Sequence, residues 1–340
     1  MKNQVSRYLC IVLSWFLLVH SATAMAQSRA SADLIEGAKK EGALVWYTVL
    51  NVQQAQFFLK QFEAKYPFIK TDLYRSVSNN VLNRVMVDRN AGKVASDVVS
   101  MGGFQSYFLK KRGLTAPYRS PEAITIPAQF KDPEGHWAGL YQNTSVIAYN
   151  TKMVSDKDVP REYGQFLEPQ WKDRLGMDDS DEEWFANQCK FMGDEKCVDF
   201  LQRLVRQNPK IVRGQSLIAN LMAAGEFPVV VVAYPSEIEL LKQKGAPVDW
   251  VAPNPVLTKI YPMAMTANGP HPNAAKLFID FAFSREGQTI LKNFKRITVR
   301  PDVEPDPPRL VRGLNIRVSD LSLAEKFEDY ARLWRKIIKG

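Results

Sequence analysis

The chain has 340 residues, with 45 Lys and Arg against 36 Asp and Glu, and only three His and three Cys. The length predicts roughly two domains, and 46% hydrophobic with 24% charged residues excludes wholesale disorder and collagen-like repeats. The net charge of +9 identifies no partner, because the basic residues are scattered rather than clustered. We expect no nucleic acid among the partners.

The first 26 residues have the pattern of a secretory signal peptide. Lys2 and Arg7 precede an apolar run over 8–19, which is too short for the ~20 residues of a membrane span, and small residues at 22–26 offer cleavage sites. We expect cleavage after Ala26 and a soluble product in the periplasm. No lipid anchor is expected, because Cys10 lies inside the apolar run. The alternative is a buried N-terminal helix.

Two cysteines remain after cleavage, Cys189 and Cys197. In an oxidising compartment such a pair favours a disulfide, and Gly193 with Asp194 predicts a turn that brings the two together. The alternative is two unpaired, small hydrophobic residues. A catalytic cysteine is not expected, because neither residue has a His nearby in the sequence.

Helices and strands alternate along the mature chain, which predicts an α/β protein. The predicted helices cover 32–41, 51–66, 78–92, 104–111, 197–206, 216–224, 236–245, 274–283 and 286–294. The predicted strands cover 43–50, 68–74, 97–100, 139–150 and 229–234. An acidic loop over 178–183 and a proline-rich loop over 301–308 interrupt this pattern.

The last segment has Leu323, Phe327, Tyr330, Trp334 and Ile337 at helical spacing. We expect an amphipathic helix that docks on its own domain. The alternative is a helix at a membrane surface, since Lys and Arg line the opposite face.

Catalytic motifs are absent from the sequence. There is no H-E-x-x-H, G-x-S-x-G or G-x-G-x-x-G, and the two His of the mature chain cannot furnish a His-rich zinc site. We therefore expect neither enzyme activity nor a cofactor. A secreted hydrolase is the alternative from the enzyme class.

Several strands end in a polar or aromatic residue immediately before a helix. Ligands of α/β sheets bind at the carboxyl ends of strands, and the N–H groups of helix N-termini favour anions there. Tyr141 and other tyrosines could add aromatic walls. The candidate ligand-binding residues are Tyr47, Thr48, Arg75, Ser78, Asn79, Gly102, Tyr141, Arg213, Ser216 and Tyr234.

Several segments of the mature chain carry a family resemblance. They are LVWYT at 44–48, AGKVASDVV at 91–99, GLYQNTSVIAYN at 139–150, AAGEFPVVVVAY at 223–234, KGAPVDWV at 244–251 and GPHPNAAKLFIDFAFSREGQ at 269–288. With them the chain resembles the periplasmic solute-binding proteins of ABC importers, in the group of ferric-iron, thiamine and phosphonate binders.

The resemblance implies a type II periplasmic-binding-protein fold, in which two lobes close on a ligand and each lobe is a mixed sheet flanked by helices. Its expected division is 27–138 with 258–312 for lobe one, and 139–257 with 313–340 for lobe two. His271 is expected at the start of a helix rather than in the site. Ferric-iron members typically use two adjacent tyrosines near Tyr234, but Pro235 follows it here. No resident metal is therefore expected, and Tyr234 would be a ligand only in an iron binder.

We predict a monomeric periplasmic receptor that captures a small anionic solute, bearing a phosphonate or a carboxylate, and delivers it to an inner-membrane permease and its ATPase. One alternative is a ferric-iron-binding periplasmic protein. Another is a sensor subunit that reports ligand to a membrane kinase.

Overall fold

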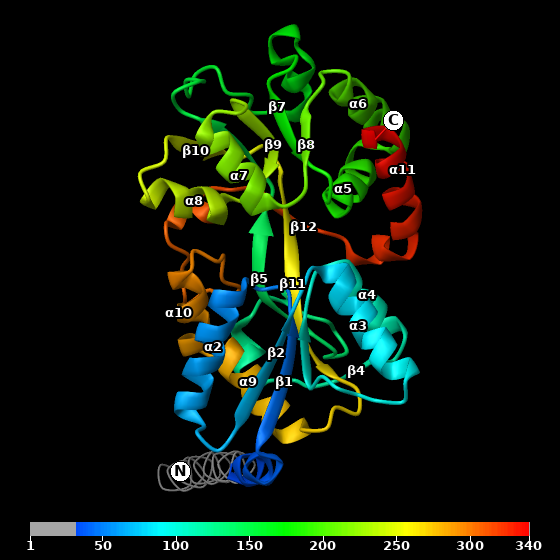
Figure 1. The fold of residues 1–340 in the computed structure, drawn as a ribbon, viewed down its shortest axis with the longest axis vertical. Coiled ribbons are helices and arrows are strands. Elements are labelled where there is room, and N and C mark those ends of the chain that lie inside the picture. Colours follow the sequence, from blue (N-terminus) through cyan, green and yellow to red (C-terminus); the bar gives the residue numbers. More distant parts are fainter. Residues whose placement is uncertain (1–31, 340) are drawn as a thin grey trace, which may run out of the picture.

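The computed structural model describes residues 32–339, so the predicted signal peptide lies outside the described residues. Two α/β lobes lie end to end along the long axis of the molecule (Figure 1). The lower lobe contains a helix over 32–41, β1 (Ala43–Thr48), α2 (Val52–Lys65), β2 (Lys70–Arg75), α3 (Ser78–Asn90), β3 (Val98–Ser100), α4 (Gly103–Lys111), β4 (Thr115–Ala116), α9 (Pro272–Phe283) and α10 (Arg285–Asn293).

The upper lobe carries the second sheet and the C-terminal helix. Its elements are β6 (Val146–Asn150), β7 (Leu175–Asp178), α5 (Glu182–Met192), α6 (Asp194–Val205), β8 (Lys210–Val212), α7 (Gln215–Ala224), β9 (Val229–Ala233), α8 (Pro235–Gln243), β10 (Val248–Val251) and α11 (Phe327–Lys339). The strands β5 (Ala138–Thr144), β11 (Val256–Thr266) and β12 (Ile316–Val318) lie toward the waist.

The first sheet has seven strands, in the order β12-β11-β3-β1-β2, with β4 and β5 also paired to β11. β1 pairs in parallel with β2 and β3, whereas β11 runs antiparallel to β3 and β5. Successive side chains of β1 alternate between the two faces. Leu44 and Trp46 enter the core formed with α2 and α9, and Val45 and Tyr47 enter the core formed with α3 and α4.

The second sheet has five strands, in the order β10-β6-β9-β7-β8. The apolar run at 229–234 forms its central strand β9, which pairs in parallel with β7 and antiparallel with β6. Helices α5, α6 and α11 cover one face, and α7 and α8 cover the other. Both sheets are mixed and flanked by helices, which confirms the expected fold class.

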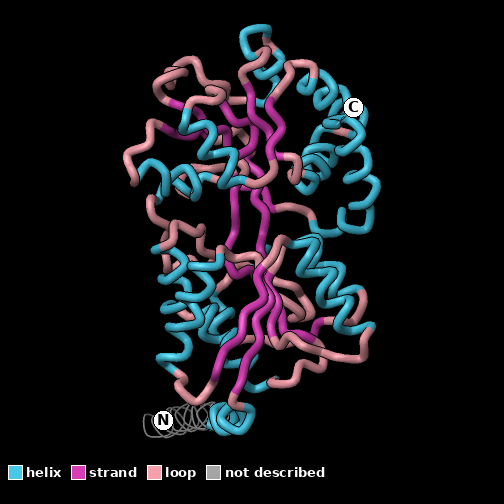
Figure 2. The backbone as a smooth tube through the Cα atoms, in the orientation of Figure 1, coloured by secondary structure: helices cyan, strands magenta, loops and turns pink. Residues whose placement is uncertain are grey.

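The long strand predicted over 139–150 is two strands in the structure. β5 belongs to the first sheet and β6 to the second, and Ser145 lies between them. β5 and β11 continue through the waist from one lobe toward the other (Figure 2). Leu310, which we expected in lobe one, packs with Val146, Ile218 and Trp250 of the upper lobe.

The C-terminal segment docks on its own domain, as expected. Trp334 is 1% exposed and packs near Trp184 and Phe185 of α5, and its indole N–H donates to the backbone oxygen of Asp179 at 2.8 Å. The helix begins later than the apolar spacing suggested, because a 3₁₀ turn over Leu321–Lys326 precedes α11. Within 32–339, no helix is long and apolar enough to cross a membrane.

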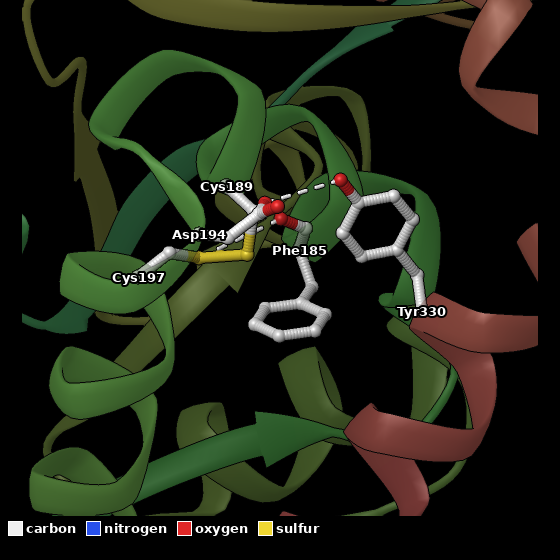
Figure 3. The surroundings of a disulfide bond; sticks show 5 residues. All are labelled: Phe185, Cys189, Asp194, Cys197 and Tyr330. Atoms are coloured by element: carbon white, nitrogen blue, oxygen red, sulfur yellow. Dashed lines mark hydrogen bonds between the residues drawn. A yellow bond between two sulfur atoms is a disulfide. The ribbon is translucent and has the colours of Figure 1, made fainter. Parts of the chain in front are cut away.

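The predicted disulfide between Cys189 and Cys197 is present (Figure 3). Cys189 lies in the last turn of α5 and Cys197 in the first turn of α6, with their Cα atoms 4.9 Å apart. Gly193 lies between the two helices with φ of 87°, a left-handed conformation that suits glycine at this turn. The bridge therefore fixes the angle between two helices that cover one face of the upper sheet.

Replacing both cysteines by alanine should lower the stability of the protein by about 2–3 kcal/mol, because the bridge closes only a short loop. Chemical denaturation of the double variant and of the wild type, each with and without reductant, measures this loss. Reductant should affect only the wild type. Two titratable thiols in unreduced, denatured wild-type protein would show that the bridge does not form.

Candidate ligand-binding cleft

A cavity of about 790 Å³ lies between the lobes, lined by residues from both. Its walls include the N-terminal ends of α2, α3, α4, α5, α7 and α8, and β5 and β11 at the waist. Eight of the ten residues predicted from the sequence line it: Arg75, Ser78, Asn79, Gly102, Tyr141, Arg213, Ser216 and Tyr234.

Tyr47 and Thr48 lie elsewhere, which corrects their predicted placement. The Tyr47 side chain faces α3, where its hydroxyl donates to Asp88 at 2.8 Å. Thr48 is fully buried and its hydroxyl lies 2.7 Å from that of Ser100 on the neighbouring strand. Tyr47 therefore links β1 to α3, and Thr48 links β1 to β3.

The lower wall of the cavity is cationic. Arg75 ends β2 and is exposed toward the cavity, and its Nε donates to the backbone oxygen of Leu50 at 3.3 Å. Within the part of the chain that is described, no carboxylate forms an ion pair with Arg75. Helices α3 and α4 begin beside it without a side-chain cap, although Ser78 Oγ accepts from the Gly102 N–H at 3.0 Å. Uncapped N–H groups and an unpaired guanidinium together favour an anion here.

Arg213 in the upper wall forms an ion pair, which Arg75 in the lower wall does not form with any described residue. The Nε of Arg213 lies 3.3 Å from Asp179, and 77% of its side chain is exposed. Gly214 follows as the N-cap of α7, and its φ of 110° suits glycine. Ser216 donates to Glu237 at 2.8 Å. Arg213 therefore already has an anionic partner, unlike Arg75.

Three tyrosines form a cluster in the cavity. The rings of Tyr141 and Tyr261 stack with centroids 4.7 Å apart, and the hydroxyl of Tyr261 lies 3.3 Å from that of Tyr234. Arg296 lies over the Tyr141 ring at 5.3 Å and also 3.7 Å from Glu237. Burial raises the pKa of Tyr141 to about 12 and raises the pKa values of Tyr234 and Tyr261 well above 10.

The predicted acidic loop, 178–183, forms part of the upper wall. Lys259 of β11 lies 3.4 Å from Asp181, and both side chains are buried. Burial raises the pKa of Asp181 to about 8, although Lys259 opposes the shift. Burial also raises the pKa of Glu183, whereas the neighbouring carboxylates outweigh burial and raise the pKa of Lys259.

Several cavity residues escaped the sequence-based prediction. They are Asn143, Glu183, Gln215, Lys259, Tyr261 and Arg296. Lys259 and Tyr261 are two positions apart in their strand and therefore lie on one face, and Lys259 is the only charged residue of β11. This pattern was the signal that could have identified them. Among the described residues, no three His, Cys, Asp or Glu side chains are arranged to hold a metal ion.

Known proteins share this arrangement. The structure is similar to that of iron-bound HitA from Pseudomonas aeruginosa, with a TM-score of 0.79, 21% identity and coverage of 87% of this chain and 99% of that one. It is also similar to AfuA from Actinobacillus pleuropneumoniae with fructose-6-phosphate bound, with a TM-score of 0.78, 23% identity and coverage of 88% and 99%. Both confirm the two-lobed periplasmic-binding-protein fold.

The sequence itself gives the family. An uncharacterised protein of Haemophilus influenzae is 24% identical over 267 residues, which are 74% of this chain and 76% of that protein. Residues 96–313, more than half of the chain, match the model of the bacterial extracellular solute-binding proteins. The family match, the fold and the cavity between the lobes agree, and the chain therefore belongs to the family of bacterial extracellular solute-binding proteins.

Proposed function

We propose that the protein is the periplasmic receptor of an ABC importer and captures a small solute bearing a phosphonate, phosphate or carboxylate group. The observation that carries this proposal is Arg75, which faces the cavity beside the uncapped N-termini of α3 and α4. A guanidinium and helix N–H groups that line the same cavity are suited to a tetrahedral or planar anion. An inner-membrane permease and its ATPase are the partners of such a receptor.

The anion would lie against the lower wall. Ser78 and Asn79 at the start of α3 and Gly102 at the start of α4 line the cavity there. Asn79 Oδ1 accepts from Gln105 Nε2 at 2.8 Å, which holds the side chain of Asn79 in place. This hydrogen bond orders the Asn79 side chain in the wall before any solute binds. AfuA, with its phosphorylated sugar, shows that a protein of this fold holds such a solute.

A ferric ion is the second candidate, because the hydroxyls of Tyr234 and Tyr261 lie only 3.3 Å apart and HitA has iron bound. Phenolate ligation would require both hydroxyls to lose their protons. Burial raises both pKa values and works against that loss. An organic solute packed against the tyrosine rings needs no deprotonation, so we favour the anionic solute.

Tyr234→Phe separates the two candidates. With an anionic solute, the variant should bind within about tenfold of wild type, because the ring still packs against the solute and only one neutral hydrogen bond is lost. With iron, the variant should lose a visible phenolate-to-metal absorption band and most of its affinity. Titration calorimetry and absorbance of protein purified without refolding measure both.

Tyr330→Phe is the matched control, because the Tyr330 hydroxyl donates to Asp194 on α6, outside the cavity. It should behave as wild type in both measurements. A band that disappears in Tyr234→Phe and persists in Tyr330→Phe would overturn the preference for an organic anion.

A further inference from the structure

The C-terminal segment, residues 319–339, is attached to the upper lobe at both of its ends. Near its start, the backbone N–H of Asp320 donates to Asn187 Oδ1 of α5 at 2.8 Å, and the Asp320 carboxylate forms an ion pair with Lys190 of the same helix. Toward its end, α11 packs on α5 through Trp334. The 3₁₀ turn between these two attachments contacts α4 of the lower lobe (Figure 1).

One face of α4 receives this turn. Gly103 begins α4, and a Cβ atom there would lie 2.5 Å from Leu321 Cδ2, so the turn packs directly against the first residue of the helix. Further along α4, the Tyr107 hydroxyl donates to Glu325 at 2.6 Å, and Lys111 Nζ lies 3.1 Å from the same carboxylate. Positions 103, 107 and 111 are four residues apart, which places them on one face of the helix.

The buried part of this contact is aromatic. Phe104 is fully buried, and its ring meets that of Phe327 edge to face with the centroids 5.5 Å apart. Edge-to-face contact is a favoured geometry for aromatic rings. Ala186 of α5 and Ala324 and Ala331 of the C-terminal segment are buried in the same cluster. The cluster therefore joins α4 of the lower lobe to α5 and α11 of the upper lobe.

The elements joined in this way also form the cavity. Phe327, the first residue of α11, lines it, and so do Gly102, the N-cap of α4, and Gln105 in the first turn of α4. The uncapped N-terminus of α4 belongs to the cationic lower wall. The position of this N-terminus relative to the upper lobe therefore depends on the contacts between α4 and the C-terminal segment.

We infer that Tyr107, Lys111 and Glu325 are positioning residues of the solute site: through them the C-terminal segment holds the N-terminus of α4, and with it the lower lobe, against the upper lobe. None of the three lines the cavity, so they act through the arrangement of the lobes and not by touching the solute. The inference goes beyond the proposed function, because it holds for any solute bound between the lobes. When this attachment is weakened, the lobes should separate more easily and the cavity should bind its solute less tightly.

The test reverses the charge at Glu325. Glu325→Lys brings a second lysine beside Lys111, whereas Lys111→Glu combined with Glu325→Lys restores an ion pair. Asp199→Lys is the matched control, because it makes the same charge change at an exposed ion pair with Arg203 inside α6. Small-angle X-ray scattering of the full mature protein measures the separation of the lobes without a ligand. Calorimetry with inorganic phosphate, methylphosphonate and acetate measures the affinity for anions.

Glu325→Lys should increase the radius of gyration. It should also weaken binding of the tightest-binding of the three anions by about three- to tenfold, because an attraction between exposed charges is replaced by a repulsion. Added salt should reduce both differences, since the side chains of Lys111 and Glu325 are each 58% exposed. The double variant should return both quantities most of the way to the wild-type values, and Asp199→Lys should match wild type.

Tyr107→Phe and Tyr330→Phe form a second pair that keeps every charge. Both remove a hydroxyl that donates to a carboxylate, but Tyr107 reaches Glu325 from the other lobe, whereas Tyr330 reaches Asp194 within the upper lobe. Only Tyr107→Phe should increase the radius of gyration and weaken anion binding. Thermal unfolding checks that each variant is folded, and this pair decides the question if Glu325→Lys does not fold.

The outcomes separate this inference from the proposed function. An equal radius of gyration for Glu325→Lys and Asp199→Lys overturns the inference, and so does a double variant that does not recover. Unchanged or tighter anion binding in Glu325→Lys also overturns it. If none of the three anions binds the wild type, the proposed function fails, while the scattering still decides whether the C-terminal segment holds the lobes together.

Discussion

Arg75→Ala should weaken binding of the solute by about ten- to a hundredfold. The guanidinium has no carboxylate partner within 32–339 and faces the cavity beside the N-termini of α3 and α4. A charge-assisted hydrogen bond is worth roughly 1.5–3 kcal/mol, and ~1.4 kcal/mol corresponds to a factor of ten in affinity. Titration calorimetry with the identified solute measures the loss.

Arg213→Ala should have a smaller effect, because this side chain is 77% exposed and already pairs with Asp179. Arg203→Ala on α6, which removes an arginine paired with Asp199 outside the cavity, should bind as wild type. If Arg75→Ala binds like Arg203→Ala, the anion site is not where we place it.

Trp334→Ala should destabilise the upper lobe by about 3–5 kcal/mol, the usual cost of truncating a large buried aromatic side chain. Trp334 fills the space between α11 and α5, beside Trp184 and Phe185, and its indole N–H satisfies the backbone oxygen of Asp179. The substitution removes both the packing and the donor, so α11 should detach more readily. Chemical denaturation followed by circular dichroism measures the loss.

Arg335→Ala provides the comparison on the same helix, because its side chain is exposed. Its stability should stay within about 0.5 kcal/mol of wild type. Equal stability of Trp334→Ala and Arg335→Ala would mean that the Trp334 side chain does not anchor α11 to the upper lobe.

The architecture followed from patterns that are local in the sequence. Apolar runs bounded by glycine predicted the strands and helices, and the junctions at Arg75, Gly102, Arg213 and Tyr234 predicted where the cavity lies. This succeeds because parallel strands bring their carboxyl ends to one edge of a sheet, whichever strands are neighbours. The disulfide was equally local, because a single turn separates its two cysteines.

The face that each strand residue takes could not be predicted in the same way. Leu44, Val45, Trp46 and Tyr47 are all large or apolar, and β1 is buried on both faces, so alternation leaves no mark in the sequence. Tyr47 therefore looked like a residue of the cavity, although it points to Asp88 on α3.

The part of the cavity formed by β5 and β11 depends on the pairing of two strands that are far apart in the sequence. Asn143 and Lys259 face each other only through the register of β5 and β11, and Lys259 then reaches Asp181 on a third element. These residues are far apart in the chain, and no short motif joins them. The ion pair of Arg213 with Asp179 also joins residues that are distant in the sequence, so the sequence did not show that Arg213, unlike Arg75, has a carboxylate partner.

Native mass spectrometry of the protein purified from the periplasm without refolding tests the binding of an organic anion most directly. We predict a complex whose additional mass is a small organic solute with a phosphonate, phosphate or carboxylate group, lost from Arg75→Ala and retained by Arg203→Ala. An additional mass equal to a ferric ion, or a solute retained equally by both variants, would contradict the assignment of the cavity to an anionic solute.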